Sequence, residues 1–144
     1  MIDIYKEFLF SSQKNNERNF EKLKPEQKEC VIFANACKSL NIEGKLNAVW
    51  LHIPNEIANN RHPRFGSLQK RMGKIAGAAD YVFLGEKNSC FIEFKVKTNT
   101  VTTKQNKNQL MFEEWCKKIG VNYFLVYSTQ EALQKLREIK LLRD

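Results

Sequence analysis

The sequence lacks the features that are typical of linkers, disulfide-rich secreted proteins and membrane anchors. It has 144 residues, but only 6 glycines, 3 prolines and 4 cysteines. It contains no internal repeat and no low-complexity segment. No stretch approaches the roughly 18 apolar residues that a membrane-spanning helix needs. Together, these absences predict one globular domain, large enough to bury its own core, with no membrane partner.

The few cysteines do not form a recognisable metal or disulfide pattern. Cys30, Cys37, Cys90 and Cys116 include no C-x-x-C pair, and each lies among apolar residues. We therefore expect reduced, buried thiols rather than zinc ligands or disulfides. The first residues, acidic and only briefly apolar, do not resemble a signal peptide. We expect a cytoplasmic protein.

Acidic residues are also comparatively scarce. Lys and Arg number 24 and Asp and Glu number 16, so the formal net charge is +8 and the sequence pI is about 9.4. Basic side chains displace the counterions that condense on phosphates. The charge balance therefore favours a polyanionic partner such as nucleic acid, although charge alone does not identify one.

Hydrophobic periodicity predicts an α/β domain. We expect residues 1–24 to form a partly helical N-terminal extension and residues 25–144 to form the domain itself. Pro25 suits the first turn of a helix, and a Thr102–Gln105 capping box is expected to open another. The expected elements are helices from Pro25 to about Gly44, over 66–74, over 104–119 and from about 129 to 141, with strands over 46–53, 78–84, 90–97 and 121–127.

The second and third strands place charged side chains in apolar surroundings. Gly85 to Asn88 have turn chemistry, so these strands should form a hairpin. Glu93 and Lys95 share one face of the third strand because side chains alternate, and Asp80 stands at the start of the second strand. Two neighbouring carboxylates suit Mg²⁺ or Mn²⁺. The alternative is an exposed sheet face with a simple Glu–Lys ion pair, and spacing alone does not decide between them.

The flanking residues resemble a nuclease family. The runs Gly77–Leu84 and Phe91–Lys95 resemble the D…ExK signature of the PD-(D/E)XK nucleases, and the wider pattern resembles the VRR-NUC branch found in phage, bacterial and DNA-repair proteins. This similarity spans roughly residues 26–135. Further matching pieces are the stretch His52–Glu56, the glycines Gly73 and Gly77 before Asp80, and Gln109 followed by Phe112, Trp115 and Gly120.

The resemblance implies a restriction-endonuclease-like core, a central mixed four-stranded sheet flanked by helices in the order αβββαβ. It also implies that Asp80, Glu93 and the main-chain carbonyl of Phe94 bind Mg²⁺ or Mn²⁺. Lys95 would then orient the attacking water.

Two further site residues follow from the resemblance. An acid of the first helix would complete the metal site, with Glu29 preferred over Glu26. A glutamine of the later helix, Gln109 or else Gln105, would hydrogen-bond near the site.

The implied activity is metal-dependent DNA hydrolysis, on branched DNA such as a Holliday junction, by a homodimer in a bacterial or phage-infected cell. His62 is expected to be a loop histidine without a catalytic role. An inactive DNA-binding module of the same fold and a basic protein-interaction domain remain alternatives. Basic residues beside the site would hold the DNA backbone: Arg61, Arg64, Lys70, Arg71, Lys74, Lys97, Lys104 and Lys107.

Overall fold

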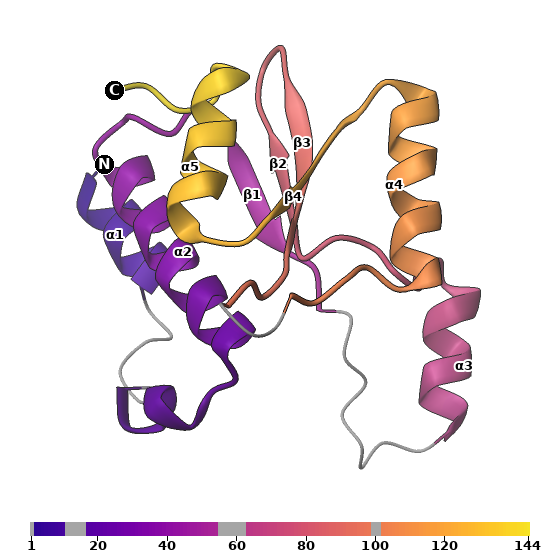
Figure 1. Cartoon of the computed structure of the whole chain (residues 1–144). Coiled ribbons are helices and arrows are strands. Elements are labelled where there is room, and N and C mark those ends of the chain that lie inside the picture. Colours follow the sequence, from indigo (N-terminus) through magenta and orange to yellow (C-terminus); the bar gives the residue numbers. More distant parts are fainter. Residues whose placement is uncertain (1, 11–16, 55–62, 99–101) are drawn as a thin grey trace.

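The computed structural model describes residues 2–10, 17–54, 63–98 and 102–144. Within these residues the chain forms an α/β fold, with a mixed four-stranded open sheet flanked by helices, as the sequence predicts (Figure 1). In chain order the elements are α1 (Ile2–Phe10), η1 (Glu17–Lys22), α2 (Pro25–Ile42), β1 (Val49–His52), α3 (Pro63–Arg71), β2 (Tyr81–Leu84), β3 (Ser89–Phe94), α4 (Lys107–Ile119), β4 (Asn122–Val126) and α5 (Thr129–Glu138).

The sheet has the strand order β1-β2-β3-β4. The first three strands are antiparallel, and Tyr81 of β2 pairs with both His52 of β1 and Ile92 of β3. The predicted hairpin turn is present, since the Gly85 N–H donates to the Asn88 carbonyl at 2.9 Å. β4 pairs with β3 in parallel, which requires a crossover connection, and α4 supplies it.

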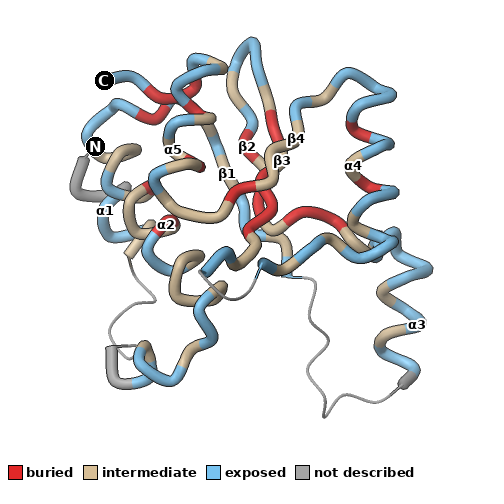
Figure 2. Tube along the Cα trace, in the orientation of Figure 1, coloured by how far each residue is buried: buried red, intermediate tan, exposed pale blue. Residues whose placement is uncertain are grey.

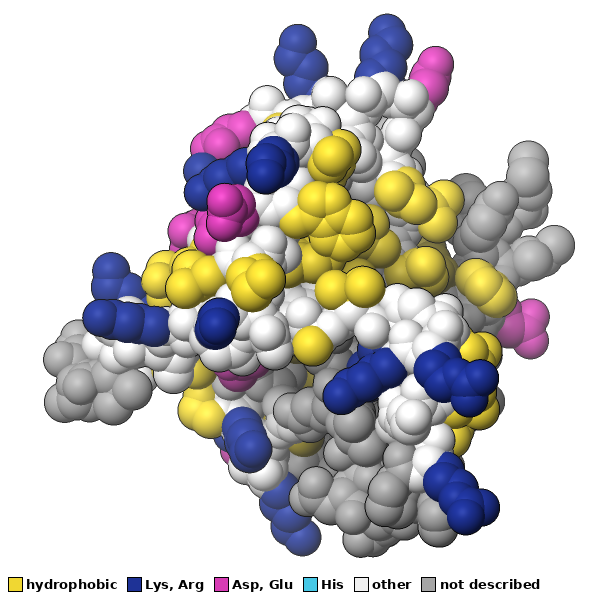
Figure 3. Space-filling model, turned by 90° about the vertical axis from the view of Figure 1, so that its right-hand side faces the viewer, with side chains coloured by type: hydrophobic (Ala, Val, Ile, Leu, Met, Phe, Trp, Pro, Cys, Tyr) yellow, Lys and Arg dark blue, Asp and Glu magenta, His cyan; other side chains and the backbone are white. Residues whose placement is uncertain are grey.

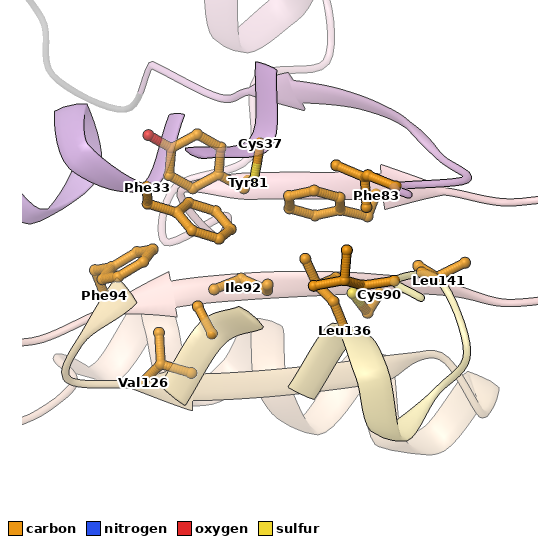
Figure 4. Close-up of a cluster of buried hydrophobic side chains, with 13 residues drawn as sticks. Phe33, Cys37, Tyr81, Phe83, Cys90, Ile92, Phe94, Val126, Leu136 and Leu141 are labelled. Carbon is orange, nitrogen blue, oxygen red and sulfur yellow. The ribbon is translucent and has the colours of Figure 1, made fainter. Parts of the chain in front are cut away.

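Helices lie on both faces of the sheet, and buried residues concentrate between the layers (Figures 1 and 2). Aromatic and aliphatic side chains of the sheet meet α2 and α5 on one face. Phe33 of α2 is fully buried there against Tyr81, Phe83 and Phe94 (Figure 4). On the other face, Phe112 of α4 makes the centre of a smaller cluster. This packing fixes both helices that border the candidate site.

The start of α4 differs from the prediction. The helix begins at Lys107, and its capping box is formed by Asn106 and Gln109 rather than by Thr102 and Gln105. Thr103 instead pairs with the segment that follows β3, and its N–H donates to the Val96 carbonyl at 2.8 Å. An Asn N-cap followed by Gln at the third helical position satisfies two N–H groups reciprocally, so the helix starts where that exchange is available.

The first 24 residues contain α1 and η1, and α1 packs against α2. Their separation from the domain stays a prediction. All four cysteines are free thiols, as predicted, and only Cys30 is not fully buried. Among the described residues, no helix combines the length and apolar character needed to span a bilayer.

Candidate functional site

Asp80 and Glu93 lie together where β2 and β3 meet. The Asp80 N–H donates to Glu93 Oε2 at 3.1 Å, and the Phe94 N–H donates to Asp80 Oδ2 at 2.8 Å. The hairpin register creates this contact. Tyr81 pairs with Ile92, so Asp80, which precedes Tyr81, lies beside Glu93, which follows Ile92. The predicted pair of neighbouring carboxylates is therefore present, with the backbone of Phe94 beside them. Its carbonyl as a metal ligand stays a prediction.

Glu93 is buried and Asp80 is half-buried, which sets this pair apart from an ordinary charged sheet surface. Glu93 is 1% exposed. Burial and the neighbouring Asp80 raise the pKa of Glu93 to about 8, and burial also raises the pKa of Asp80. The exposed-face alternative is therefore wrong for Glu93. A buried acid in contact with a half-buried one is costly as a pair of anions unless positive charge compensates them.

The cation closest to Glu93 is Lys95, whose Nζ lies 3.6 Å from Glu93 Oε1. The Lys95 side chain is itself largely buried, at 11% exposure. This is a long, single contact and not a bidentate pair. Lys95 compensates one negative charge of the cluster, so the cluster keeps a deficit of positive charge when both carboxyl groups are ionised.

Gln109 orients Glu93 from the first turn of α4. Its Nε2 donates to Glu93 Oε1 at 2.7 Å, and its Oε1 accepts the Asn106 N–H at 3.0 Å. Because the amide oxygen is held by the helix cap, the amide nitrogen must face the carboxylate. The structure thus brings Gln109 to the site, whereas Gln105 donates to the Tyr123 hydroxyl at 3.1 Å.

Gly77 allows α4 to approach this closely. Its φ is +83°, a conformation that side chains other than glycine rarely adopt. A Cβ at this position would collide with the backbone of Asn108 and Gln109. The glycine that precedes Asp80 therefore serves the placement of Gln109.

The two acids of α2 have different surroundings. Glu26 lines the same cavity as Asp80 and Glu93, and its charge contributes to the raised pKa of Glu93. Glu29 Oε2 instead accepts hydrogen bonds from the N–H and the hydroxyl of Thr129, at 3.0 and 2.8 Å. These bonds tie α2 to the first turn of α5. The structure places Glu26 at the site and Glu29 at a helix junction, the reverse of the sequence-based preference.

His52 is a neighbour of the site that the sequence analysis did not single out. Its Nδ1 lies 2.9 Å from the Asp80 carbonyl. Because a carbonyl only accepts, Nδ1 carries the proton, and Nε2 of the neutral ring remains an acceptor. The pairing of His52 with Tyr81 places it beside Asp80. Predicting the β1–β2 pairing, and not only the β2–β3 hairpin, would have found it.

The donor set suits a hard cation held partly by water. Among the residues that the structure describes, no three His, Cys, Asp or Glu side chains form a group able to hold a metal ion by themselves. Mg²⁺ commonly binds through one or two carboxylates and completes its coordination with water and substrate phosphate. Asp80 and Glu93, with Glu26 nearby, fit that mode, whereas a closed protein cage does not.

The predicted DNA-binding residues are placed only in part. Lys70 and Arg71 are exposed in the last turn of α3, and Arg64 is exposed near its start. Lys97 and Lys104 are exposed on the chain between β3 and α4, and Lys107 is exposed at the first position of α4. Lys74 is half-buried, with its Nζ 3.4 Å from Gln69 Oε1. Arg61 and His62 lie outside the described residues.

Comparison with family models, characterised proteins and solved structures gives no match for this chain. Its function therefore has to be inferred from the site. We infer it from the net positive charge of the chain, the contact between Asp80 and Glu93, and the hydrogen bond that Gln109 donates to Glu93.

Proposed function

We propose that this protein is a Mg²⁺- or Mn²⁺-dependent nuclease that hydrolyses phosphodiester bonds in DNA. One observation carries the proposal: buried Glu93 and half-buried Asp80 are in contact, and the pKa of Glu93 is about 8 even with Lys95 beside it. Both groups can be ionised together at neutral pH only if additional positive charge compensates them. A divalent cation supplies that charge, and perturbed acids of this kind concentrate at functional sites.

Each residue has a defined task in this scheme. A bound Mg²⁺ or Mn²⁺ lowers the pKa of water and neutralises charge on a phosphate. Asp80 and Glu93 hold the cation, and Gln109 keeps Glu93 in one orientation. Lys95 places a fixed positive charge at the site, where it orients the attacking water and stabilises negative charge on the phosphoryl group.

The order of the elements supports this proposal. From α2 to β4 the chain runs helix, three strands, helix, strand, with α3 inserted between the first two strands. This is the αβββαβ order of the restriction-endonuclease-like core that the D…ExK resemblance implies. We infer that the fold is of this type, with Asp80 before β2 and Glu93 and Lys95 at the end of β3.

DNA is the proposed substrate because of charge. The net charge is +8, and the exposed basic residues Arg64, Lys70, Arg71, Lys97 and Lys104 lie on the segments that lead into and away from the site. Phosphate contacts of this kind hold a DNA backbone without reading its sequence. Affinity that falls steeply with salt is the expected signature.

A homodimer is proposed from an uncovered apolar surface. Phe91 packs on Phe112 of α4, so Val82, its partner in β2, faces the same way. On that same face, α4 does not cover Val49, Leu51 and Leu84. These side chains are 68, 60 and 51% exposed. Figure 3 shows hydrophobic side chains gathered over the α4 side of the molecule. A second copy would cover this surface, and two active sites would then serve the two strands of a branched DNA.

The test is a cleavage panel with single strands, duplex, flaps and four-way junctions, each with Mg²⁺, Mn²⁺ or chelator. We expect cleavage with either metal, none with chelator, and the highest rate on branched substrates. Binding that weakens with salt but never leads to cleavage with Mn²⁺ would favour the inactive DNA-binding module. If the protein shows no salt-dependent DNA binding, the result would instead favour a basic protein-interaction domain.

A further inference from the structure

The carboxylates lie at one end of a longer groove. A cavity of about 710 Å³ is bordered by Asp80 and Glu93 and continues along α2 past Cys30 and Ala34 to Lys38. From Glu26 to Lys38 the helix advances 12 residues, or about 18 Å at 1.5 Å per residue. The groove therefore extends well beyond the acids that would hold a cation.

The side chains that line this groove change from acidic to apolar to basic along its length. Acidic side chains border one end, Lys38 borders the other, and Val31, Ala34 and Trp50 line the stretch between them. Lys38 Nζ lies 5.5 Å from the centre of the Phe10 ring of α1, which holds the ammonium group at that end. With a divalent cation bound at the acidic end, an occupant that fits has an anionic group at each end and a flat or apolar group between them.

Trp50 forms a rigid part of the wall. Its indole N–H donates to Asn41 Oδ1 at 2.7 Å, and its ring stacks on Phe83 with centroids 5.9 Å apart and planes at 18°. Asn41 is held in turn, since its Nδ2 donates to the carbonyls of Leu46 and Ala48. An aromatic ring fixed in this way loses little entropy when a flat group packs against it.

We propose that this groove binds an unpaired nucleotide of the substrate strand, next to the phosphate that is cut. The inference rests on the proposed nuclease function and specifies its substrate class. One phosphate of the strand lies at the carboxylate end, where a cation neutralises it, and a phosphate further along the strand, at the other end of the groove, is paired with Lys38. The base of an unpaired nucleotide between them packs against Trp50 and the Val31–Ala34 surface.

A base stacked inside a duplex does not present its face to a protein, whereas an unstacked base does. The volume agrees with this occupant, because pockets that enclose a small organic molecule measure roughly 300–1,000 Å³. The proposed substrates are therefore DNAs with an extrahelical or single-stranded nucleotide at the cleavage point. A fully paired duplex lacks the group that the apolar stretch would bind.

Binding measured with Ca²⁺, which carboxylates also bind, under conditions where cleavage is verified to be absent, tests this inference apart from the nuclease proposal. Fluorescence anisotropy would compare a paired duplex, the same duplex with one extrahelical adenine, and one with an abasic site in place of that adenine. The variant Ala34→Leu fills the groove without changing charge. Ser39→Leu is its matched control, since Ser39 is exposed on α2 outside the groove.

We expect wild-type protein to bind the adenine probe roughly tenfold more tightly than the abasic probe, in the range that one stacked base contributes. Ala34→Leu should remove that difference, and Ser39→Leu should keep it. Equal affinity of the wild type for all three probes would overturn the inference. The inference would also be overturned if Ala34→Leu weakened binding of the abasic probe as much as binding of the adenine probe. That result would mean that the groove binds only the sugar-phosphate backbone of the DNA. Metal-dependent cleavage, measured separately, decides the nuclease proposal itself.

Discussion

At the residue scale, the chemistry depends on which acids face one another. The strand alternation and the hairpin were sufficient to predict that Asp80, Glu93 and Lys95 are neighbours, because hairpin register is local. The choice between Glu26 and Glu29 was not local. It depends on how α2 is rotated against the sheet and α5, and the bonds of Glu29 to Thr129 join residues 100 positions apart.

The two acids of α2 make a matched pair for mutation. Glu26→Gln removes a negative charge from the site, so we expect metal-dependent cleavage to fall by roughly 10- to 100-fold, the range seen when groups around a metal are changed. Glu29→Gln weakens the charged acceptor for Thr129, so it should lower the free energy of unfolding by about 1 kcal/mol and keep cleavage. Steady-state cleavage and chemical denaturation of both variants check this. Loss of cleavage in Glu29→Gln alone would reverse our assignment.

The raised pKa of Glu93 makes stability depend on pH. The pKa of Glu93 is about 8 in the folded state and near its ordinary value of 4.5 in the unfolded state. At a pH between these values, the folded state therefore holds a proton that the unfolded state has lost. Stability is then greatest below about pH 4.5 as far as this group contributes, and decreases as pH rises towards 8. The raised pKa of Asp80 acts in the same direction.

Thermal unfolding in chelator between pH 5 and 8 should therefore show a melting temperature that falls with pH. Glu93→Gln, which cannot ionise, should flatten that dependence, and added Mg²⁺ or Mn²⁺ should raise the wild-type melting temperature most at the upper end. An unchanged slope in Glu93→Gln would show that another group is responsible.

At the element scale, the order of helices and strands followed from periodicity and turn residues, since each signal lies within one segment. Strand ends and the start of α4 were less well predicted. Thr102 and Gln105 have the right spacing for a capping box, but the pairing of Thr103 with Val96 holds that stretch in an extended conformation. Asn106 then becomes the cap, which is what turns Gln109 towards Glu93.

Gly77 and Gly73 provide a test of how α4 is positioned. Both have positive φ, but a Cβ at Gly73 would meet nothing within 4 Å, whereas one at Gly77 would meet the backbone of α4. Gly73→Ala should cost about 1 kcal/mol of backbone strain. Gly77→Ala should cost clearly more and lower cleavage as well, because Gln109 is displaced. Denaturation and cleavage assays compare them, and equal effects of the two would argue against this role of Gly77.

At the scale of the whole molecule, the open apolar sheet face beside α4 is what the sequence could not reveal. Val49 and Leu51 look like ordinary core residues of a strand. Only the placement of α4 over the β3–β4 half of the sheet leaves them exposed. Val49 and Leu51 would be buried if α4 crossed the sheet closer to β1.

If a second copy covers this face, charges placed in it should separate the copies. We expect wild-type protein to sediment as a dimer in analytical ultracentrifugation, and Leu51→Glu and Val49→Glu to sediment as monomers. Ile32→Glu introduces the same kind of change on α2, away from the surface, and should stay dimeric. A wild-type monomer that cleaves junctions and linear duplex alike would contradict the homodimer.

The most direct test of the central claim compares DNA cleavage by wild-type protein and by Asp80→Asn in Mn²⁺. The two side chains have nearly the same shape, and circular dichroism can verify that both proteins fold. We predict wild-type cleavage that chelator abolishes, and a loss on the order of 10²-fold or more in Asp80→Asn, since a group that stabilises charge at the reacting centre contributes that much. Cleavage of equal rate by the two proteins would contradict the assignment of Asp80 and Glu93 as the hydrolytic centre.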